Sequence, residues 1–212
     1  MSQINEILAT EFKQKQLYID NVISLLDEGN TIPFIARYRK EMHGSMDDTL
    51  LRDLETRLKY LRNLQERKEE VCKSIDGQGK LSDELKASID RAVTLSEVED
   101  LYRPFKQKRR TRATIAKEKG LEPLALVIFN QDGQNPESLA EAYLNEEKGV
   151  VTIEDALSGA SDIIAEMISD NPEIRKALRT KMEQRAIIRV QAADPNVDSV
   201  YRLYYDFSAP VY

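Results

Sequence analysis

The 212-residue sequence contains very little cysteine, histidine, glycine or proline, and no tryptophan. Its one cysteine, Cys72, excludes an internal disulfide bond and any zinc site built from several cysteines. Its one histidine, His43, excludes histidine-rich metal sites and the HExxH motif of metalloproteases. Eight glycines and seven prolines are too few for an all-β fold with many turns. We therefore expect no metal site and no cofactor.

Long apolar runs are missing as well. No segment approaches the roughly 18 apolar residues that span a bilayer. The first residues, MSQINEILATEFKQKQL, carry Glu6 and Glu11 and lack the apolar run of a signal peptide. Because a lone thiol is typical of compartments where thiols stay reduced, we expect a cytoplasmic protein without membrane contact.

The overall charge is acidic, with 31 Lys and Arg against 37 Asp and Glu, a formal net charge of -6. Hydrophobic residues make up 41% and charged residues 32%, which is typical of a soluble globular chain of one large or two small domains. The acidic balance argues against a histone-like surface, but it allows a local basic patch.

A helical period dominates the chain. The longest stretch, residues 47–75, begins with Asp47 or Asp48 as a plausible N-cap and ends before Gly77. Its apolar residues recur at nearly heptad spacing: Leu51, Leu54, Leu58, Leu61, Leu64, Val71 and Ile75. Further helices are predicted at 3–15, 17–28, 32–43, 82–93, 96–102, 113–119, 121–131 and 137–147, and from Thr152, Pro172 and Asp194 onward. No strand is predicted, so the expected fold is an all-α multi-helix bundle.

We divide the chain into three parts. Residues 1–102 form a helical N-terminal region with a helix-turn-helix-like element and the long helix. Residues 103–195 hold a basic loop and a second helical part. Residues 196–212, which end in YRLYYDFSAPVY, are expected to be a linker toward an absent domain, so that the chain is a fragment of a longer protein.

The strongest local feature is the basic segment, residues 103–119, which reads RPFKQKRRTRATIAKEK. One acid, Glu118, stands among eight cations: Arg103, Lys106, Lys108, Arg109, Arg110, Arg112, Lys117 and Lys119. Such a cluster attracts phosphates and predicts salt-dependent nucleic-acid binding. The alternative is structural, with these arginines paired to acids such as those of the Glu97/Glu99/Asp100 turn. The two interpretations predict different exposure of Arg109, Arg110 and Arg112.

A second cationic element is IPFIARYRKE, residues 32–41, which follows a glycine-containing turn. A short helix in that position suits a helix-turn-helix arrangement, in which Arg37, Arg39 and Lys40 contact phosphates. The alternative is a packed hairpin whose arginines extend to solvent or pair with carboxylates, and most short amphipathic helices are simply packed.

The residues present do not support a catalytic function. Gly77-Gln78-Gly79-Lys80 resembles the end of a phosphate-binding loop, but Leu81 replaces the Ser or Thr and a helix precedes it. Cys72 lies inside the long predicted helix, where a packing role is more common than nucleophilic catalysis. Acidic pairs such as Asp47/Asp48 suit caps and solvated faces. We expect no catalytic residues and no enzyme activity in this chain.

Several strings together resemble the N-terminal region of the Tex family of bacterial transcription accessory proteins. They are listed here in chain order: IPFIARYRKE (32–41), LRDLE (51–55), KRRTRATIAKEKGLEPLA (108–125), ALSGASDIIAEMIS (156–169) and YYDFSAPV (204–211). The likeness covers nearly the whole chain. Departures from the family pattern are His43 in place of Thr, Arg103 in place of an apolar residue, Phe105 in place of Tyr and Gln107 in place of Pro.

The resemblance implies an all-helical module with a helix-turn-helix-like element, at the start of a longer nucleic-acid-binding protein. In that family a YqgF-type RNase H-like domain, helix-hairpin-helix elements and an RNA-binding OB-fold domain follow, and none of them is in this chain. The expected partners are therefore RNA or DNA and the transcription machinery, contacted through the basic segment. The rival expectation is a scaffold module that packs against the absent domains and binds no nucleic acid itself.

Overall fold

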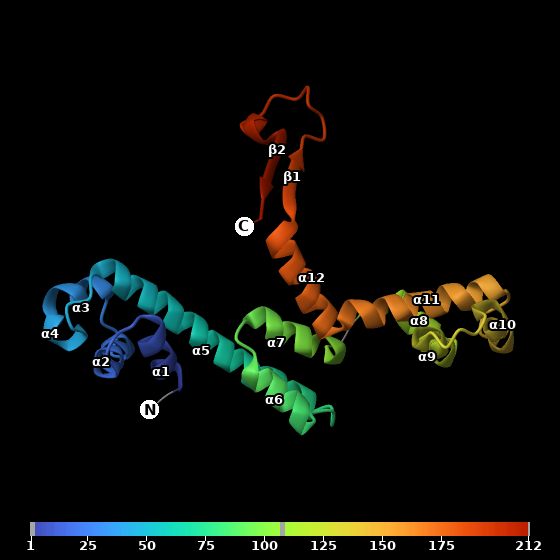
Figure 1. Cartoon of the computed structure of the whole chain (residues 1–212), viewed down its shortest axis with the longest axis horizontal. Helices are drawn as coiled ribbons and strands as arrows, with labels where there is room; N and C mark the ends of the chain where they lie inside the picture. Colours follow the sequence, from blue (N-terminus) through green and yellow to red (C-terminus); the bar gives the residue numbers. More distant parts are fainter. Residues whose placement is uncertain (1–2, 107–108, 212) are drawn as a thin grey trace. The chain divides into compact units, whose positions relative to one another are not determined.

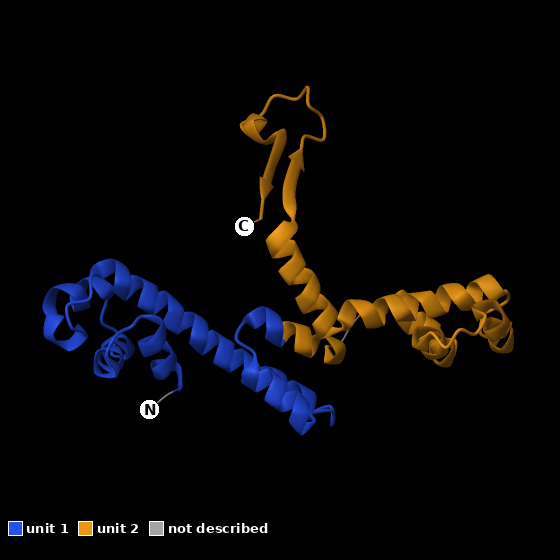
Figure 2. Cartoon of the chain, viewed as in Figure 1, with its two compact units in different colours: residues 1–98 blue, residues 99–212 orange. Residues whose placement is uncertain are grey.

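The computed structural model describes residues 3–106 and 109–211. It divides into two compact units, residues 1–98 and residues 99–212, with the division inside one helix (Figure 2). Helices make up most of both units across the described residues (Figure 1), which confirms the predicted mostly α fold. Among those residues, no helix is long and apolar enough to cross a membrane.

Unit 1, residues 1–98, is built on one long helix, α5 (Asp48–Asp76). The predicted cap is present, because the Asp47 carboxylate accepts the Leu50 N–H at 2.8 Å. All seven apolar residues predicted for its stripe are buried. The shorter helices of this unit are α1 (Gln3–Glu11), α2 (Gln16–Asp27), α3 (Ile32–Tyr38), α4 (Lys40–His43) and α6 (Asp83–Arg91), followed by the start of α7 (Leu95–Tyr102).

The core of unit 1 lies where α1, α2 and α3 meet the first half of α5. Its buried residues include Leu8, Ile19, Val22, Ile35, Leu51, Leu54 and Leu58. The end of α4 is tightly packed, since a Cβ on Gly44, whose φ is +62°, would lie 2.4 Å from the Tyr18 ring. His43 beside it is fully buried, and neither ring nitrogen has a hydrogen-bond partner within residues 3–106 and 109–211. His43, at the end of α4, is thus part of the core.

Helix α7 begins at Leu95, one residue before the predicted start at Ser96, and Ser96 does not cap it. Instead, the Thr94 hydroxyl accepts the Glu97 N–H at 3.2 Å, and the Glu97 carboxylate accepts the Val93 N–H at 2.8 Å. The Thr94 hydroxyl and the Glu97 carboxylate together therefore satisfy two backbone N–H groups at the start of this helix.

Unit 2, residues 99–212, has its core where three short helices pack on α11 (Ile153–Asp170). These helices are α8 (Arg112–Glu118), α9 (Glu122–Asn130) and α10 (Pro136–Ala140), with the 3-10 turns η1 (Arg103–Phe105) and η2 (Glu141–Tyr143). The helix predicted over 137–147 is too long, because the chain turns after Tyr143 and bridges Asn145 to Val150. The predicted start at Thr152 is confirmed by a complete capping box with Asp155.

The end of unit 2 corrects the prediction that the chain has no strand. Helix α12 (Pro172–Arg185) stops before Ile187, and β1 (Ile187–Gln191) pairs antiparallel with β2 (Asp206–Pro210). Residues 194–204, predicted as helix, form a loop with the 3-10 turn η3 (Arg202–Tyr204). The physical reason is twofold: β-branched Ile187, Ile188 and Val190 favour extended backbone, and their pairing partner lies about twenty residues away, beyond the reach of local periodicity.

Candidate nucleic-acid interface

Among the described residues, the basic segment begins with η1 and continues into α8. Helix α8 begins at Thr111, whose hydroxyl accepts the Thr114 N–H at 3.1 Å and lies 3.1 Å from a Glu166 carboxylate oxygen on α11. Ala113 and Ala116 are buried against α11. Since one face of this helix is fixed in the core, its charged residues lie on the outer side.

The close approach of α8 to α11 depends on Gly159. A Cβ at that position would lie 2.3 Å from the Leu121 Cδ1 atom and 3.3 Å from the Ala116 Cβ atom. The glycine of the ALSGASD string is therefore a packing residue, and it sets the depth at which α8 sits.

The three arginines that discriminate between the two interpretations are all solvent-exposed. Arg109 has no hydrogen-bond or ion-pair partner among the described residues. Arg110 pairs with Glu118 at 2.7 Å, and both side chains are more than half exposed. The Arg112 side chain is 87% exposed and lies 3.7 Å from an Asp162 oxygen. Exposed pairs of this kind are worth only about 0–1 kcal/mol, so they leave the guanidinium groups accessible to a phosphate.

The remaining cations of the segment differ in their exposure and in their hydrogen-bond and ion-pair partners. Lys106 is exposed and without a partner among the described residues, and Lys117 forms an exposed pair with Glu122 at 3.1 Å. The Lys119 ammonium donates to the Gly149 carbonyl at 2.8 Å. Arg103 donates to Asp170, which is 13% exposed, at 2.8 Å. Lys108 lies outside the described residues. Arg103 and Lys119 therefore tie the segment to the rest of unit 2.

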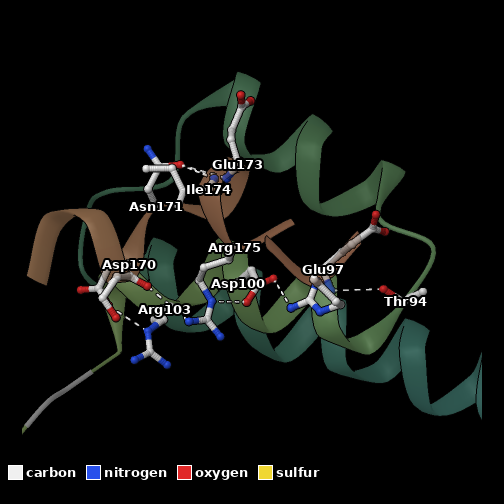
Figure 3. Close-up of polar contacts among 11 residues, drawn as sticks. Thr94, Glu97, Asp100, Arg103, Asp170, Asn171, Glu173, Ile174 and Arg175 are labelled. Atoms are coloured by element: carbon white, nitrogen blue, oxygen red, sulfur yellow. Dashed lines mark hydrogen bonds and ion pairs between the residues drawn. The ribbon is translucent and has the colours of Figure 1, made fainter. Parts of the chain in front are cut away.

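Asp100, which the structural interpretation pairs with the basic segment, is bound by other arginines. It accepts from Arg175 and Arg179 of α12, each at 2.6 Å, and its side chain is only 6% exposed (Figure 3). Burial raises the pKa of the Asp100 carboxyl, but the two arginine hydrogen bonds outweigh that effect and hold the pKa below its ordinary value. This clamp joins α7 to α12, and the Arg103–Asp170 pair beside it joins η1 to α11.

Unit 1 carries the second predicted group of cations. Arg37 and Lys40 are exposed and have no side-chain partner among the described residues. Arg39 donates to the Tyr38 carbonyl at 3.1 Å and lies 5.2 Å from the centre of the Phe34 ring. The four residues between α2 and α3 include Gly29 at φ +86°, so a glycine-containing turn separates these two helices.

Sequence reasoning missed the cations of α12. Five of its fourteen residues are Arg or Lys against two Glu, a signal that was available in the sequence. Arg175 and Arg179 form the Asp100 clamp, whereas Lys181 and Arg185 are exposed and without a partner among the described residues.

No cluster of three potential metal ligands occurs in the part of the chain that the structure describes. Cys72 is partly buried on α5, and burial, with a contribution from Asp90, raises the pKa of its thiol.

Comparison with known proteins gives matches along most of the chain. The family model for the Tex-like protein N-terminal domain matches residues 2–76, and the model for the Tex central region matches residues 131–212. An uncharacterized protein, YdcI, from Bacillus subtilis is 47% identical over 98% of this chain. The transcriptional accessory protein Tex of Neisseria gonorrhoeae is 45% identical over 98% of this chain. A human S1 RNA-binding domain-containing protein is 29% identical over 90% of it.

This chain spans only 20–30% of the length of those three relatives.

Proposed function

The chain belongs to the Tex family, and on that premise we propose that it binds nucleic acid through the exposed cations of the basic segment. The observation that carries this proposal is the exposure of Arg109, Arg110 and Arg112, none of which has a buried carboxylate partner among the residues that the structure describes. Together with Lys106 and Lys117 they contact backbone phosphates. Because phosphate contacts carry no information on base identity, the binding has little sequence preference.

Several other features support this proposal. One relative is named a transcriptional accessory protein, and the name of another includes an RNA-binding domain, so RNA or DNA is the natural ligand class for the parent protein. Arg37 and Lys40 provide a second, smaller group of phosphate contacts on the helix-turn-helix-like element. The module acts in the cytoplasm, alongside the transcription machinery.

We propose that this module is not an enzyme. His43 and Cys72 are the side chains from which a His/Cys nucleophilic pair would be built, and their surroundings do not favour nucleophilic catalysis. His43 is buried in the core of unit 1, and the raised pKa of Cys72 keeps its thiol protonated at neutral pH.

A fluorescence-anisotropy titration tests the nucleic-acid proposal, using single- and double-stranded DNA and RNA at two salt concentrations. The test variant is Arg109→Gln/Arg110→Gln/Arg112→Gln. The matched control is Arg52→Gln/Lys59→Gln/Lys86→Gln, which removes three exposed cations from unit 1. For a duplex, each lost phosphate contact lowers the slope of log K against log salt by about 0.9.

We expect the test variant to lose about two to three units of that slope and the control to keep the wild-type value. Circular dichroism checks that both variants remain folded. Absence of salt-sensitive binding by the wild-type chain, or equal binding by the test and control variants, contradicts the proposal.

A second candidate function is a protein-interaction module, which one specific observation favours. Large apolar side chains that are exposed gather in residues 178–211, where they include Leu178, Met182, Ile188, Tyr201 and Leu203. Exposed apolar surface of this extent is typical of a docking site.

A further inference from the structure

The last part of unit 2 lacks a core of its own. Helix α12 buries none of its residues, and Leu178 and Met182, one turn apart, are 55% and 62% exposed. All five residues of β1 are exposed as well. A two-stranded hairpin by itself is only marginally stable in water, and it gains stability when an apolar face is covered.

The hairpin has such a face. In the register of the two strands, Ile188 pairs with Ala209 and Val190 with Phe207. Side chains alternate between the two faces of a strand, and paired residues share a face, so these four lie on one side. Arg189, Gln191, Asp206 and Ser208 lie on the other, with Ile187 and Pro210 at its end. We call the apolar side the hairpin face; Ile188, Val190 and Phe207 on it are each more than a third exposed.

A hollow of about 420 Å³ adjoins this face. It is lined mainly by apolar and aromatic side chains, among them Val190, Val197, Tyr201, Tyr204 and Tyr205. The Tyr205 hydroxyl donates to the Val197 carbonyl and lies within hydrogen-bond distance of the Ser199 hydroxyl, which holds the loop around the hollow. Val190 belongs to both the hairpin face and the hollow, so the two form one continuous apolar surface.

The charges of the hairpin argue for a protein occupant over a nucleic acid. Residues 187–211 contain two arginines against three aspartates, and Arg202 lies 3.5 Å from Asp198. This balance offers no attraction for a polyphosphate backbone, which dominates nucleic-acid affinity. An occupant with an apolar surface of low charge fits both the face and the hollow.

We propose that the hairpin face and its hollow dock onto another part of the same polypeptide in full-length proteins of this family. The lengths of the relatives support this occupant, since 70–80% of each lies outside the region that this chain matches. A covalently linked partner has a high effective concentration, so a modest apolar face suffices to hold it. This inference rests on the second candidate function and is independent of phosphate binding by the basic segment.

Amide hydrogen exchange tests the inference in a full-length chimera, in which residues 1–212 replace the matching region of Bacillus subtilis YdcI. Exchange of the amides of β1 and β2 is compared between the chimera and the free 212-residue chain. We expect at least about tenfold slower exchange in the chimera, because docking must open before these amides exchange. Helix α8 serves as the internal reference.

Two double variants of the chimera locate the contact. Ile188→Lys/Phe207→Lys places charge on the hairpin face and is expected to abolish the added protection. Leu126→Lys/Phe129→Lys, at residues of similar exposure on α9, is the matched control and is expected to retain it. Tyr201→Ala/Tyr204→Ala changes the hollow and no residue of either strand, and it is expected to reduce the protection. This variant distinguishes loss of docking from unfolding of the hairpin.

Three results overturn the inference. The first is unchanged exchange of the hairpin in the chimera, or protection that the charged face variant retains. The second is protection of the hairpin in the free chain that increases with the concentration of the chain, which would show that the face binds a second copy. The third is protection of the free chain by single-stranded RNA. The anisotropy titration of the basic-segment variant is unaffected by any of these, so failure of the two proposals is distinguishable.

Discussion

Replacing Asp100 with Asn tests whether the arginine clamp stabilises unit 2. The Asp100 side chain is 6% exposed and accepts two hydrogen bonds of 2.6 Å from Arg175 and Arg179, which are about one-third exposed. Removing one partner of a fully buried pair costs about 3–5 kcal/mol. Because these arginines regain part of their hydration, we expect a smaller loss of unfolding free energy, about 2–3 kcal/mol.

The assay is thermal unfolding followed by circular dichroism at 222 nm, with attention to the transition of unit 2. For a chain of this size, 1 kcal/mol corresponds to about 2–4 °C in Tm, so the loss amounts to about 4–12 °C. Glu118→Gln is the control, since it breaks an arginine pair of 2.7 Å whose side chains are both more than half exposed. We expect that control to change the unfolding free energy by less than about 1 kcal/mol.

The pH dependence of the Asp100→Asn effect gives an independent check, because the direction of that dependence follows from the pKa of Asp100. The pKa of Asp100 is lower in the folded chain than its ordinary value, so its ionised form contributes stability above that ordinary value, near pH 4. This contribution is lost as the pH falls through the folded pKa. The difference in Tm between wild type and Asp100→Asn should therefore shrink at pH 3 relative to pH 7. A difference that is absent at pH 7, or equal at both pH values, refutes the reasoning.

Three further perturbations follow from the packing. Gly159→Val should lower the unfolding free energy of unit 2 by about 1–3 kcal/mol, because its Cβ overlaps Leu121; an unchanged Tm contradicts the close packing of α8 on α11. His43→Leu should raise the Tm of unit 1, since it removes two buried ring nitrogens that have no partner; a large loss of stability would indicate that the ring is hydrogen-bonded. Cys72 should react with iodoacetamide more slowly than free cysteine at pH 7.4, because burial raises its pKa, and reach the free rate in urea; equal rates in the folded chain are the contrary result.

The helices of this protein are predictable because their signals are local. The stripe from Leu51 to Ile75, the cap at Asp47 and the capping box at Thr152 lie within a few residues of the helices that they define. The hairpin is different: Ile187 and Ile188 continue the apolar residues of α12 in sequence, and only pairing with residues 206–210 reveals a strand.

The candidate site is likewise predictable only in those features that depend on the local sequence. The cationic composition of residues 103–119 is visible in the sequence, and so is the alternative that its arginines pair with acids. The actual partners are set by the tertiary fold, because Asp100 pairs with residues 75 and 79 positions later, and Asp162 on α11 lies beside Arg112. Exposure of Arg109 and Arg110 is likewise a property of the packed helices and not of the local sequence.

The central position of α5 has a consequence for synthesis on the ribosome. Leu8, Ile19 and Ile35 of the first three helices are buried against its first half, while α6 packs on it further along, where Val71 and Ile75 are buried. The first 47 residues therefore leave the ribosome before the surface that covers their apolar sides exists. Since chains fold as their domains emerge, the apolar sides of α1 to α4 lack their cover on α5 until about residue 64 is available, and in that interval they are open to aggregation.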